Sequence, residues 1–197
     1  MVKRYNFLMS ATKDPVTWHW TRETYHRAVE LGLFGETPRL ELIRGEIYLK
    51  MPMNPPHSTA VTKATKALLL AFGEGFAIRP QLPIGLSMDG EPEPDISVVT
   101  GEPDDYVEHP TESDLLLVLE ISDSTLAFDQ GLKSEVYAEA GIAEYWILDI
   151  NARTLEVRRE PRGKIYRSTH LYDDTQSAAP LAKPDALIAI AELLPKP

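Results

Sequence analysis

The sequence contains no cysteine among its 197 residues. This absence excludes disulfide bonds, zinc sites with thiolate ligands and cysteine nucleophiles, and it leads us to expect a cytoplasmic protein. No apolar run approaches the roughly 20 residues that a membrane-spanning helix needs. The first 15 residues, MVKRYNFLMSATKDP, also lack a sustained apolar core. We therefore expect no signal peptide and no membrane partner.

Basic residues are outnumbered, since 20 Lys and Arg stand against 30 Asp and Glu, for a formal net charge of -10. Taken alone, this charge argues against a polyanionic partner, because proteins bind phosphates mainly through Lys and Arg. The charge is unevenly distributed, however. Residues 102–114 hold six acids and no base, and the net charge would be -4 without them. Residues 153–167 hold six bases against two acids, so nucleic acid stays open as a partner.

Hydrophobic residues make up 43% of the chain, which is ample for a packed core. Apolar periodicity and capping residues predict helices at 21–32, 54–73 and 128–141. Strands are expected at 76–79, 82–86, 95–99, 115–121 and 143–150, and hairpins at 39–51 and 153–167. The apolar tail at 184–195 matches no pattern clearly. The sum is an α/β (α+β) fold, in which helices flank a mixed sheet and a helical crossover joins two buried strands.

Two carboxylates lie at the ends of predicted buried strands, where desolvation is costly unless something offsets the charge. Asp95 follows Pro94 at the start of one strand, and Glu120 lies near the end of another, 25 residues later. If these strands are antiparallel neighbours, the two carboxylates meet at one edge of the sheet. Two carboxylates and water suit a hard cation such as Mg²⁺. Such an ion would activate a water and hold a phosphate oxygen during phosphodiester cleavage.

This arrangement resembles the PD-(D/E)xK nuclease superfamily. The Pro-Asp pair at 94–95 supplies the first half, but residues 120–122 read Glu-Ile-Ser, with serine where the superfamily has lysine. Lys133 follows on the next predicted helix and shares a helix face with Tyr137, four residues later. A lysine on that helix can bring its ammonium group to the same place. There it can neutralise developing phosphorane charge or help to deprotonate the water.

The order of several motifs makes the resemblance closer. The segments LELIRGEI, PPHSTAV, PEPDISVV, LVLEISDST and DQGLKSEVYAEAGIAEYWILD follow one another and precede a basic strand. Over roughly residues 17–160, the chain is similar to the Uma-type family of restriction-endonuclease-like proteins, long labelled as a domain of unknown function. In that family the lysine lies on the helix. The run that begins at Lys133 is the most specific part of the match.

The resemblance implies a restriction-endonuclease-like core and a DNA endonuclease that depends on Mg²⁺ or Mn²⁺. Its catalytic residues would be Asp95, Glu120 and Lys133, and its metal ligands would be Asp95, Glu120 and Glu41. His57 matches a family histidine without an assigned role. Together with Tyr137 it is a candidate accessory residue.

We further expect one restriction-endonuclease-like domain over residues 1–197. Its core would span about 17–160, with an N-terminal extension at 1–16 and a C-terminal extension at 161–197, and the sheet would carry an extra C-terminal β-hairpin. Contacts with the DNA backbone are expected from the basic hairpin, through Arg153, Arg158, Arg159, Arg162, Lys164 and Arg167. Cutting both strands of a duplex calls for two sites, so we expect a homodimer with two-fold symmetry. No nucleotide cofactor is expected.

Most of these residues also have an explanation without chemistry. A Pro-Asp dipeptide often marks a turn, and Glu41 can face solvent in a strand whose alternate side chains point outward. His57 can simply begin a helix, and Tyr137 and Trp146 can be core or interface aromatics. The basic hairpin can be a solvated edge whose charges block further strand pairing. We expect residues 102–114 to be a solvent-facing linker.

Glu120 has a specific alternative, because a glutamate deep in an apolar strand is usually paired. A buried ion pair with Lys133 would explain both residues without a metal. The second hypothesis is therefore a catalytically inactive dimeric module of the same fold, which binds nucleic acid or protein. A catalytic site should bind Mg²⁺ or Mn²⁺ through Asp95 and Glu120. A scaffold should show Glu120 and Lys133 closed on each other, with no room for an ion.

Overall fold

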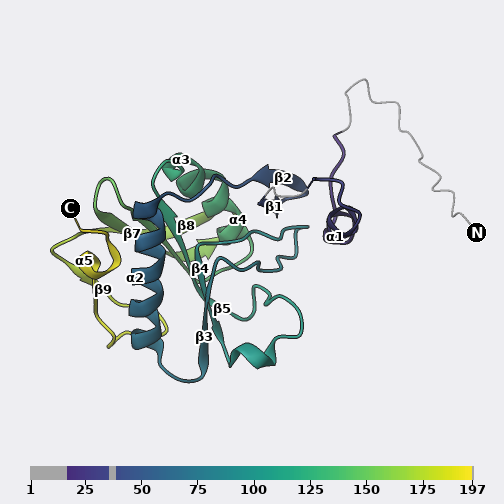
Figure 1. The fold of residues 1–197 in the computed structure, drawn as a ribbon. Coiled ribbons are helices and arrows are strands. Elements are labelled where there is room, and N and C mark those ends of the chain that lie inside the picture. The colour runs from purple at the N-terminus through teal and green to yellow at the C-terminus, as the bar shows by residue number, and fades with distance from the viewer. Residues whose placement is uncertain (1–16, 36–38, 197) are drawn as a thin grey trace, which may run out of the picture.

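A computed structural model describes residues 17–35 and 39–196, so the predicted extension at 1–16 lies outside the described residues. Its centre is a six-stranded sheet in the order β3-β4-β5-β6-β7-β8 (Figure 1). The strands are β3 (Phe76–Pro80), β4 (Ile96–Thr100), β5 (Leu115–Ser122), β6 (Glu144–Asp149), β7 (Thr154–Arg162) and β8 (Ile165–Asp173). Only β5 and β6 are parallel within this sheet. The expected mixed sheet with flanking helices is confirmed.

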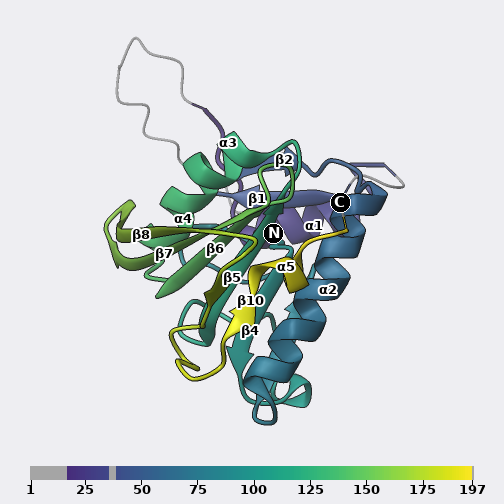
Figure 2. The same ribbon diagram turned by 90° about the vertical axis from the view of Figure 1, so that its left-hand side faces the viewer.

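The long helix α2 (Pro55–Phe72) covers one face of the sheet (Figures 1 and 2). Asn54 caps its N-terminus by accepting the backbone N–H of His57. Prolines in the first turn cost nothing there, because those N–H groups have no partner within the helix. The buried face of α2 consists of Ala60, Val61, Ala64, Leu68 and Phe72. These side chains join the core with alternate side chains of β4, β5 and β6.

The C-terminal tail packs on the same side of the sheet as α2 (Figure 2). It forms an antiparallel pair, β9 (Ser177–Ala178) and β10 (Ile188–Ala189), followed by the short helix α5 (Ile190–Leu193). Lys63 of α2 donates a hydrogen bond to the backbone carbonyl of Leu194. The apolar tail, which matched no pattern clearly, therefore completes the core on this face.

The crossover from β5 to β6 covers the opposite face. It consists of α3 (Leu126–Phe128), a π-helical turn (Asp129–Lys133) and α4 (Ser134–Glu139). The expected helix at 128–141 is therefore interrupted by one wider turn, a feature that is frequent at functional sites. The hairpin of β1 (Leu40–Ile43) and β2 (Glu46–Leu49) lies near this crossover, and α1 (Arg22–Glu30) lies beyond it (Figure 1).

Residues 82–86 do not form the strand that we expected. Pro83 has no N–H to donate to a ladder, and the segment makes only isolated bridges. Ile84 and Leu86 are nevertheless 0% and 1% exposed. Their apolar character therefore reflects burial of a loop on the sheet rather than strand pairing.

Residues 102–114 face solvent, but they are more ordered than a plain linker. Their carboxylates bind backbone N–H groups: Glu102 accepts from Gly75, and Asp114 accepts from Thr111. The hairpin expected at 153–167 forms as β7 and β8, although it is longer and reaches Asp173. Within the described residues, no helix is both long and apolar enough to cross a membrane.

Candidate active site

Asp95 and Glu120 meet at the edge of the sheet where β4 begins and β5 ends. Antiparallel pairing of Ile96 with Leu119 places the two carboxylates side by side. The N–H of Asp95 donates to Glu120 Oε2 over 3.2 Å, and the N–H of Ile121 donates to Asp95 Oδ2 over 2.8 Å. The two residues are 7% and 4% exposed. Backbone pairing therefore holds one oxygen of each buried carboxylate in position.

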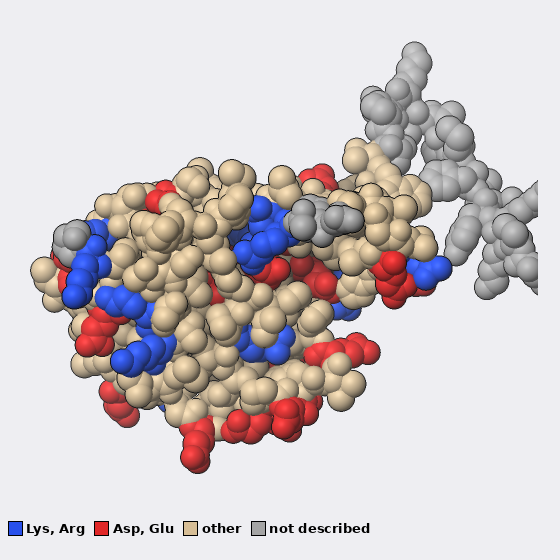
Figure 3. Space-filling model, viewed as in Figure 1, with Lys and Arg blue, Asp and Glu red and all other residues tan. Residues whose placement is uncertain are grey.

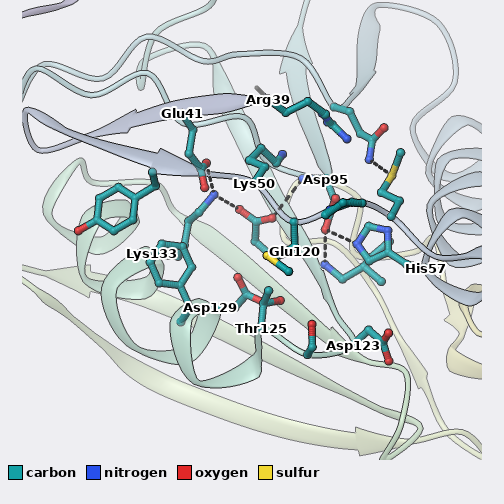
Figure 4. Close-up of a pocket in the computed structure, with 18 of the residues that line it drawn as sticks. Arg39, Glu41, Lys50, His57, Asp95, Glu120, Asp123, Thr125, Asp129 and Lys133 are labelled. Atoms are coloured by element: carbon teal, nitrogen blue, oxygen red, sulfur yellow. Dashed lines mark hydrogen bonds and ion pairs between the residues drawn. The ribbon is translucent and has the colours of Figure 1, made fainter. Parts of the chain in front are cut away.

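Lys133 reaches these carboxylates from the π-helical turn of the crossover (Figure 4). Its ammonium group donates to Glu120 Oε1 over 3.0 Å and to Glu41 Oε2 over 2.6 Å. Tyr137, one helical turn later, donates its hydroxyl to Glu120 Oε1 over 2.7 Å. The structure thus brings the lysine to Glu120 from the helix, while Ser122 occupies the next position on the same face of the strand.

Glu41 does not face solvent, because it is 4% exposed and bound to Lys133. It lies in β1, whose hairpin packs against the end of the sheet near the two other carboxylates (Figure 4). The backbone N–H of Glu93 also donates to its Oε2, over 3.3 Å. Three separate segments therefore supply these three carboxylates: β1, β5 and the residue before β4.

His57 lies in the first turn of α2 and points at Asp95 (Figure 4). Its Nε2 is 3.2 Å from Asp95 Oδ2. A carboxylate oxygen accepts hydrogen bonds, so Nε2 is the atom that carries the proton in this contact. Nδ1 is buried and has no hydrogen-bond partner in the part of the chain that the structure describes. His57 is therefore a neighbour of the carboxylates as well as a helix-start residue.

Sequence reasoning misses Asp129, a further carboxylate that lines the same cavity. Its Oδ2 accepts the hydroxyl of Ser122 over 2.7 Å and the hydroxyl of Thr125 over 2.6 Å, and the residue is 4% exposed. In the sequence, Asp129 looks like an ordinary first-turn residue of a helix. The one available signal was Ser122, a hydroxyl at the end of a buried strand that needs a partner.

The environment shifts the pKa values of the three central groups differently. Burial raises the pKa of Glu120 to about 7, even though the charge of Lys133 acts in the opposite direction. Burial also acts to raise the pKa of Asp95, but His57 and the N–H of Ile121 outweigh it and the pKa is lowered. The pKa of Lys133 is raised, because its two carboxylate partners outweigh burial. At neutral pH, Asp95 is ionised, Lys133 is charged and Glu120 is near its midpoint.

A cavity of about 360 Å³ opens beside these groups. Besides the residues already described, its lining includes the apolar side chains Tyr48, Leu49, Met51, Pro52, Met53 and Phe128. The basic residues Arg39 and Lys50 also line it, and both form ion pairs with Glu93. The cavity therefore combines buried carboxylates, one buried ammonium group and an apolar wall.

The donor set fits a hard cation only with the help of water. No three His, Asp or Glu side chains in residues 17–35 and 39–196 are grouped so that they could hold a metal ion alone. Both side-chain oxygens of Glu120 accept hydrogen bonds, whereas Oδ1 of Asp95 accepts none from the described residues. Mg²⁺ commonly uses one or two carboxylates and keeps several waters. Asp95 and Glu120, beside a cavity that has room for water, match that requirement.

The structure does not bring the basic hairpin to this cavity, because β7 and β8 lie at the far end of the sheet from β4. Three of its arginines are paired within the chain: Arg153 with Asp174, Arg158 with Glu156 and Arg159 with Glu144. The other three basic residues, Arg162, Lys164 and Arg167, are exposed. On the face shown in Figure 3, basic and acidic side chains are interspersed and form no continuous basic surface.

Comparisons with known proteins place this geometry in context. The family model described as "Uma2: Putative restriction endonuclease" matches residues 22–190. A crystal structure of "a putative nuclease belonging to DUF820" from Anabaena variabilis is similar, with a TM-score of 0.66 and 20% sequence identity. The match covers 84% of this chain and 95% of that chain, and at this identity it shows a shared fold. No curated protein matched the chain.

Proposed function

Because the chain belongs to the Uma2 family, described as "Putative restriction endonuclease", we propose that it is a metal-dependent DNA endonuclease. The proposal rests on one observation. The ammonium group of Lys133 donates to Glu120, and Glu120 also accepts the backbone N–H of Asp95. These three groups come from separate segments, yet they meet at one cavity. An ion pair that served stability alone would need neither the second carboxylate nor the cavity.

Asp95 and Glu120 would hold Mg²⁺ or Mn²⁺, with Glu41 completing the set of ligands directly or through water. Such an ion, when bound, polarises a phosphoryl oxygen and lowers the pKa of a bound water. His57 and the N–H of Ile121 favour the ionised form of Asp95, as its lowered pKa indicates. A carboxylate that is held ionised can accept a cation at neutral pH without first losing a proton.

Lys133 would act through its charge. Its raised pKa keeps the ammonium group protonated at neutral pH, so it cannot accept a proton from the attacking water. A fixed positive charge in a buried site does stabilise the negative charge that develops on the phosphorane. Of the two roles that a lysine could have here, the surroundings of Lys133 favour charge stabilisation over proton abstraction. Tyr137 would be a positioning residue, since its hydroxyl holds Glu120 Oε1.

The proposed substrate is the phosphodiester backbone of DNA. One site of this kind cuts one strand, so cutting a duplex would require two copies of the chain, related by a two-fold axis.

The same ion pair also supports a second proposal, a non-catalytic binding module of this fold. Lys133 already has two carboxylate partners and is 3% exposed. This is the closed pair that a scaffold requires. The cavity beside it and the unbonded Oδ1 of Asp95 argue for the catalytic proposal.

Calorimetric titration of Mn²⁺, combined with a nicking assay on supercoiled plasmid, separates the two proposals. Wild type, Asp95→Ala and Glu120→Ala would be compared, with Lys66→Ala, at an exposed position of α2, as a surface control. The nuclease proposal predicts Mn²⁺ binding and nicking in the wild type and the control, and loss of both in the two site variants. Absence of Mn²⁺ binding by the wild type would refute the metal site and favour the module.

A further inference from the structure

A second cavity, of about 680 Å³, lies outside the candidate active site. Its lining comes from α1, β3, the segment before β4 and the acidic loop, and includes Arg22, His26, Arg79, Glu91 and Tyr106. Arg79 pairs with Ser97 in the ladder between β3 and β4. Ser97 is two residues from Asp95, and alternate residues of a strand share a face. Arg79 therefore projects from the face of the sheet that carries the Asp95 carboxylate.

Arg79 has more hydrogen-bond donors than partners. Its Nε is buried without a partner among the described residues, and the hydrogen bond from Nη2 to the carbonyl of Pro83 is long, at 3.4 Å. The guanidinium carbon lies 5.9 Å from the centre of the Tyr106 ring, within the range of a cation–π contact. Burial lowers the pKa of Arg79, but an arginine keeps its charge in proteins. The charged side chain thus lines the cavity, and its buried Nε–H group lacks a partner within the described residues.

Arg22 enters the same cavity from the first turn of α1. Within the described residues it forms no ion pair, whereas Arg27, in the last turn of the same helix, pairs with Glu30. A Cβ atom built on Gly85 would lie 2.3 Å from Arg22 Nη1. The guanidinium group therefore rests directly on the backbone at Gly85, a position that tolerates it because glycine has no side chain.

Two glutamates, Glu91 and Glu108, line the same cavity, but within the described residues neither forms an ion pair with Arg22 or Arg79. Glu91 is held by His26, whose Nε2 is 2.8 Å from Glu91 Oε2. Glu108, on the acidic loop, is exposed and forms no ion pair among the described residues. In a chain of net charge -10, this cavity holds two arginines that have no carboxylate partner among the described residues, alongside the two glutamates. Guanidinium groups bind phosphate oxygens through paired N–H donors.

We infer that Arg22 and Arg79 bind a phosphate of the DNA backbone. This inference rests on the proposed nuclease function and extends it. It assigns backbone contact to this cavity on the Asp95 face, whereas the sequence had indicated the hairpin of β7 and β8.

The test measures DNA binding without metal, so that it does not depend on catalysis. The fluorescence anisotropy of a labelled duplex would be followed in EDTA at several salt concentrations. The Arg22→Ala/Arg79→Ala double variant should reduce the slope of log K against log salt by about 1 for each arginine. The matched control, Arg162→Ala/Lys164→Ala, removes the same charge from the exposed hairpin turn and should leave the slope unchanged.

Two further measurements sharpen the result. Gly85→Ala keeps both charges but displaces Arg22, so it should reduce the slope by about half as much as the double variant if position matters. Inorganic phosphate, titrated into ¹⁵N-labelled protein, should shift the Nε–Hε resonance of Arg79. A slope reduced only in the hairpin control would overturn the inference. A response to phosphate without any change in duplex binding would assign the cavity to free phosphate and overturn the DNA contact.

The two proposals can fail separately. If the wild type binds no Mn²⁺ and does not nick plasmid, while the arginine variant still loses salt dependence, the nuclease function fails and the DNA contact stands. If nicking depends on Asp95 but the arginine variant binds DNA as the wild type does, the nuclease function stands and this contact fails.

Discussion

Replacement of Glu120 by glutamine should abolish nicking and yet stabilise the fold above neutral pH. Burial raises the pKa of Glu120 from 4.5 to about 7. In the unfolded chain, Glu120 ionises at the lower pKa. Between pH 4.5 and about 7, the folded protein therefore binds more protons than the unfolded chain does, and its stability falls as pH rises. The loss is complete above the folded pKa and amounts to about 3 kcal/mol. A glutamine side chain at this position does not ionise, so the variant would escape the loss.

The loss of a hydrogen bond offsets part of this gain in stability. Both oxygens of Glu120 accept hydrogen bonds, one from Lys133 and Tyr137 and the other from the N–H of Asp95. An amide group offers one acceptor and one donor, so one of these contacts is lost at a cost of about 1 kcal/mol. Glu120→Gln should therefore be about 2 kcal/mol more stable than the wild type at pH 8.5. At pH 4 it should be no more stable.

Urea unfolding of metal-free protein, followed by tryptophan fluorescence from pH 4 to 8.5, measures this difference. Asp95→Asn is the control of opposite sign. The pKa of Asp95 is lowered by its surroundings, so its ionised form contributes stability that is present above its ordinary pKa and lost as pH falls. Asp95→Asn should therefore destabilise the protein at neutral pH. A Glu120→Gln protein that is several kcal/mol less stable than the wild type at pH 8.5 would refute the reasoning and identify a stabilising buried ion pair.

Three further predictions test other parts of the molecule. Lys133→Gln leaves the buried carboxylates of Glu41 and Glu120 without a cation, so at pH 8 it should cost about 3–5 kcal/mol in urea unfolding and slow plasmid nicking by at least about 100-fold. Asn54→Ala removes the cap that accepts the N–H of His57 and should cost about 1 kcal/mol in the same unfolding assay. Leu68→Ala, at a position with 0% exposure, should cost about 2–5 kcal/mol. Calorimetry should nevertheless show unchanged Mn²⁺ affinity, because α2 contacts the site only through its first turn; altered affinity would contradict that separation.

Local signals in the sequence predicted much of the fold. Thr21 and Asn54 begin helices because their side chains accept backbone N–H groups within the next turn. The hairpin of β1 and β2 turns at Arg44-Gly45, where both residues have positive φ angles of 49° and 73°. Continuous apolar runs identified β5 and β6 as central strands, because both faces of such strands are covered. Each of these signals acts within a few residues, and the sequence displays it directly.

The same local reasoning gave a wrong prediction where apolar side chains are buried in the core but their backbone does not pair in a sheet. Residues 82–86 have strand-like composition, but Ile84 and Leu86 contribute only their side chains to the core. The C-terminal tail could not be assigned for a different reason. Its helix is so short that the buried residues Ile190 and Leu193 do not reveal a helical period. In both cases the contact partners lie far away in the chain, and composition alone does not identify them.

By itself, the sequence determined most of the secondary elements, the two buried central strands and the pair Asp95 and Glu120, because these depend on periodicity and on the cost of burying charge. The tertiary structure decided which groups join that pair. Lys133 and Glu41 are 92 residues apart in the chain and 2.6 Å apart in space, and the distant residues Arg22 and Arg79 share one cavity. Such contacts depend on how the crossover, the first hairpin and α1 pack against the sheet, and packing sums many weak interactions that no short stretch of sequence records.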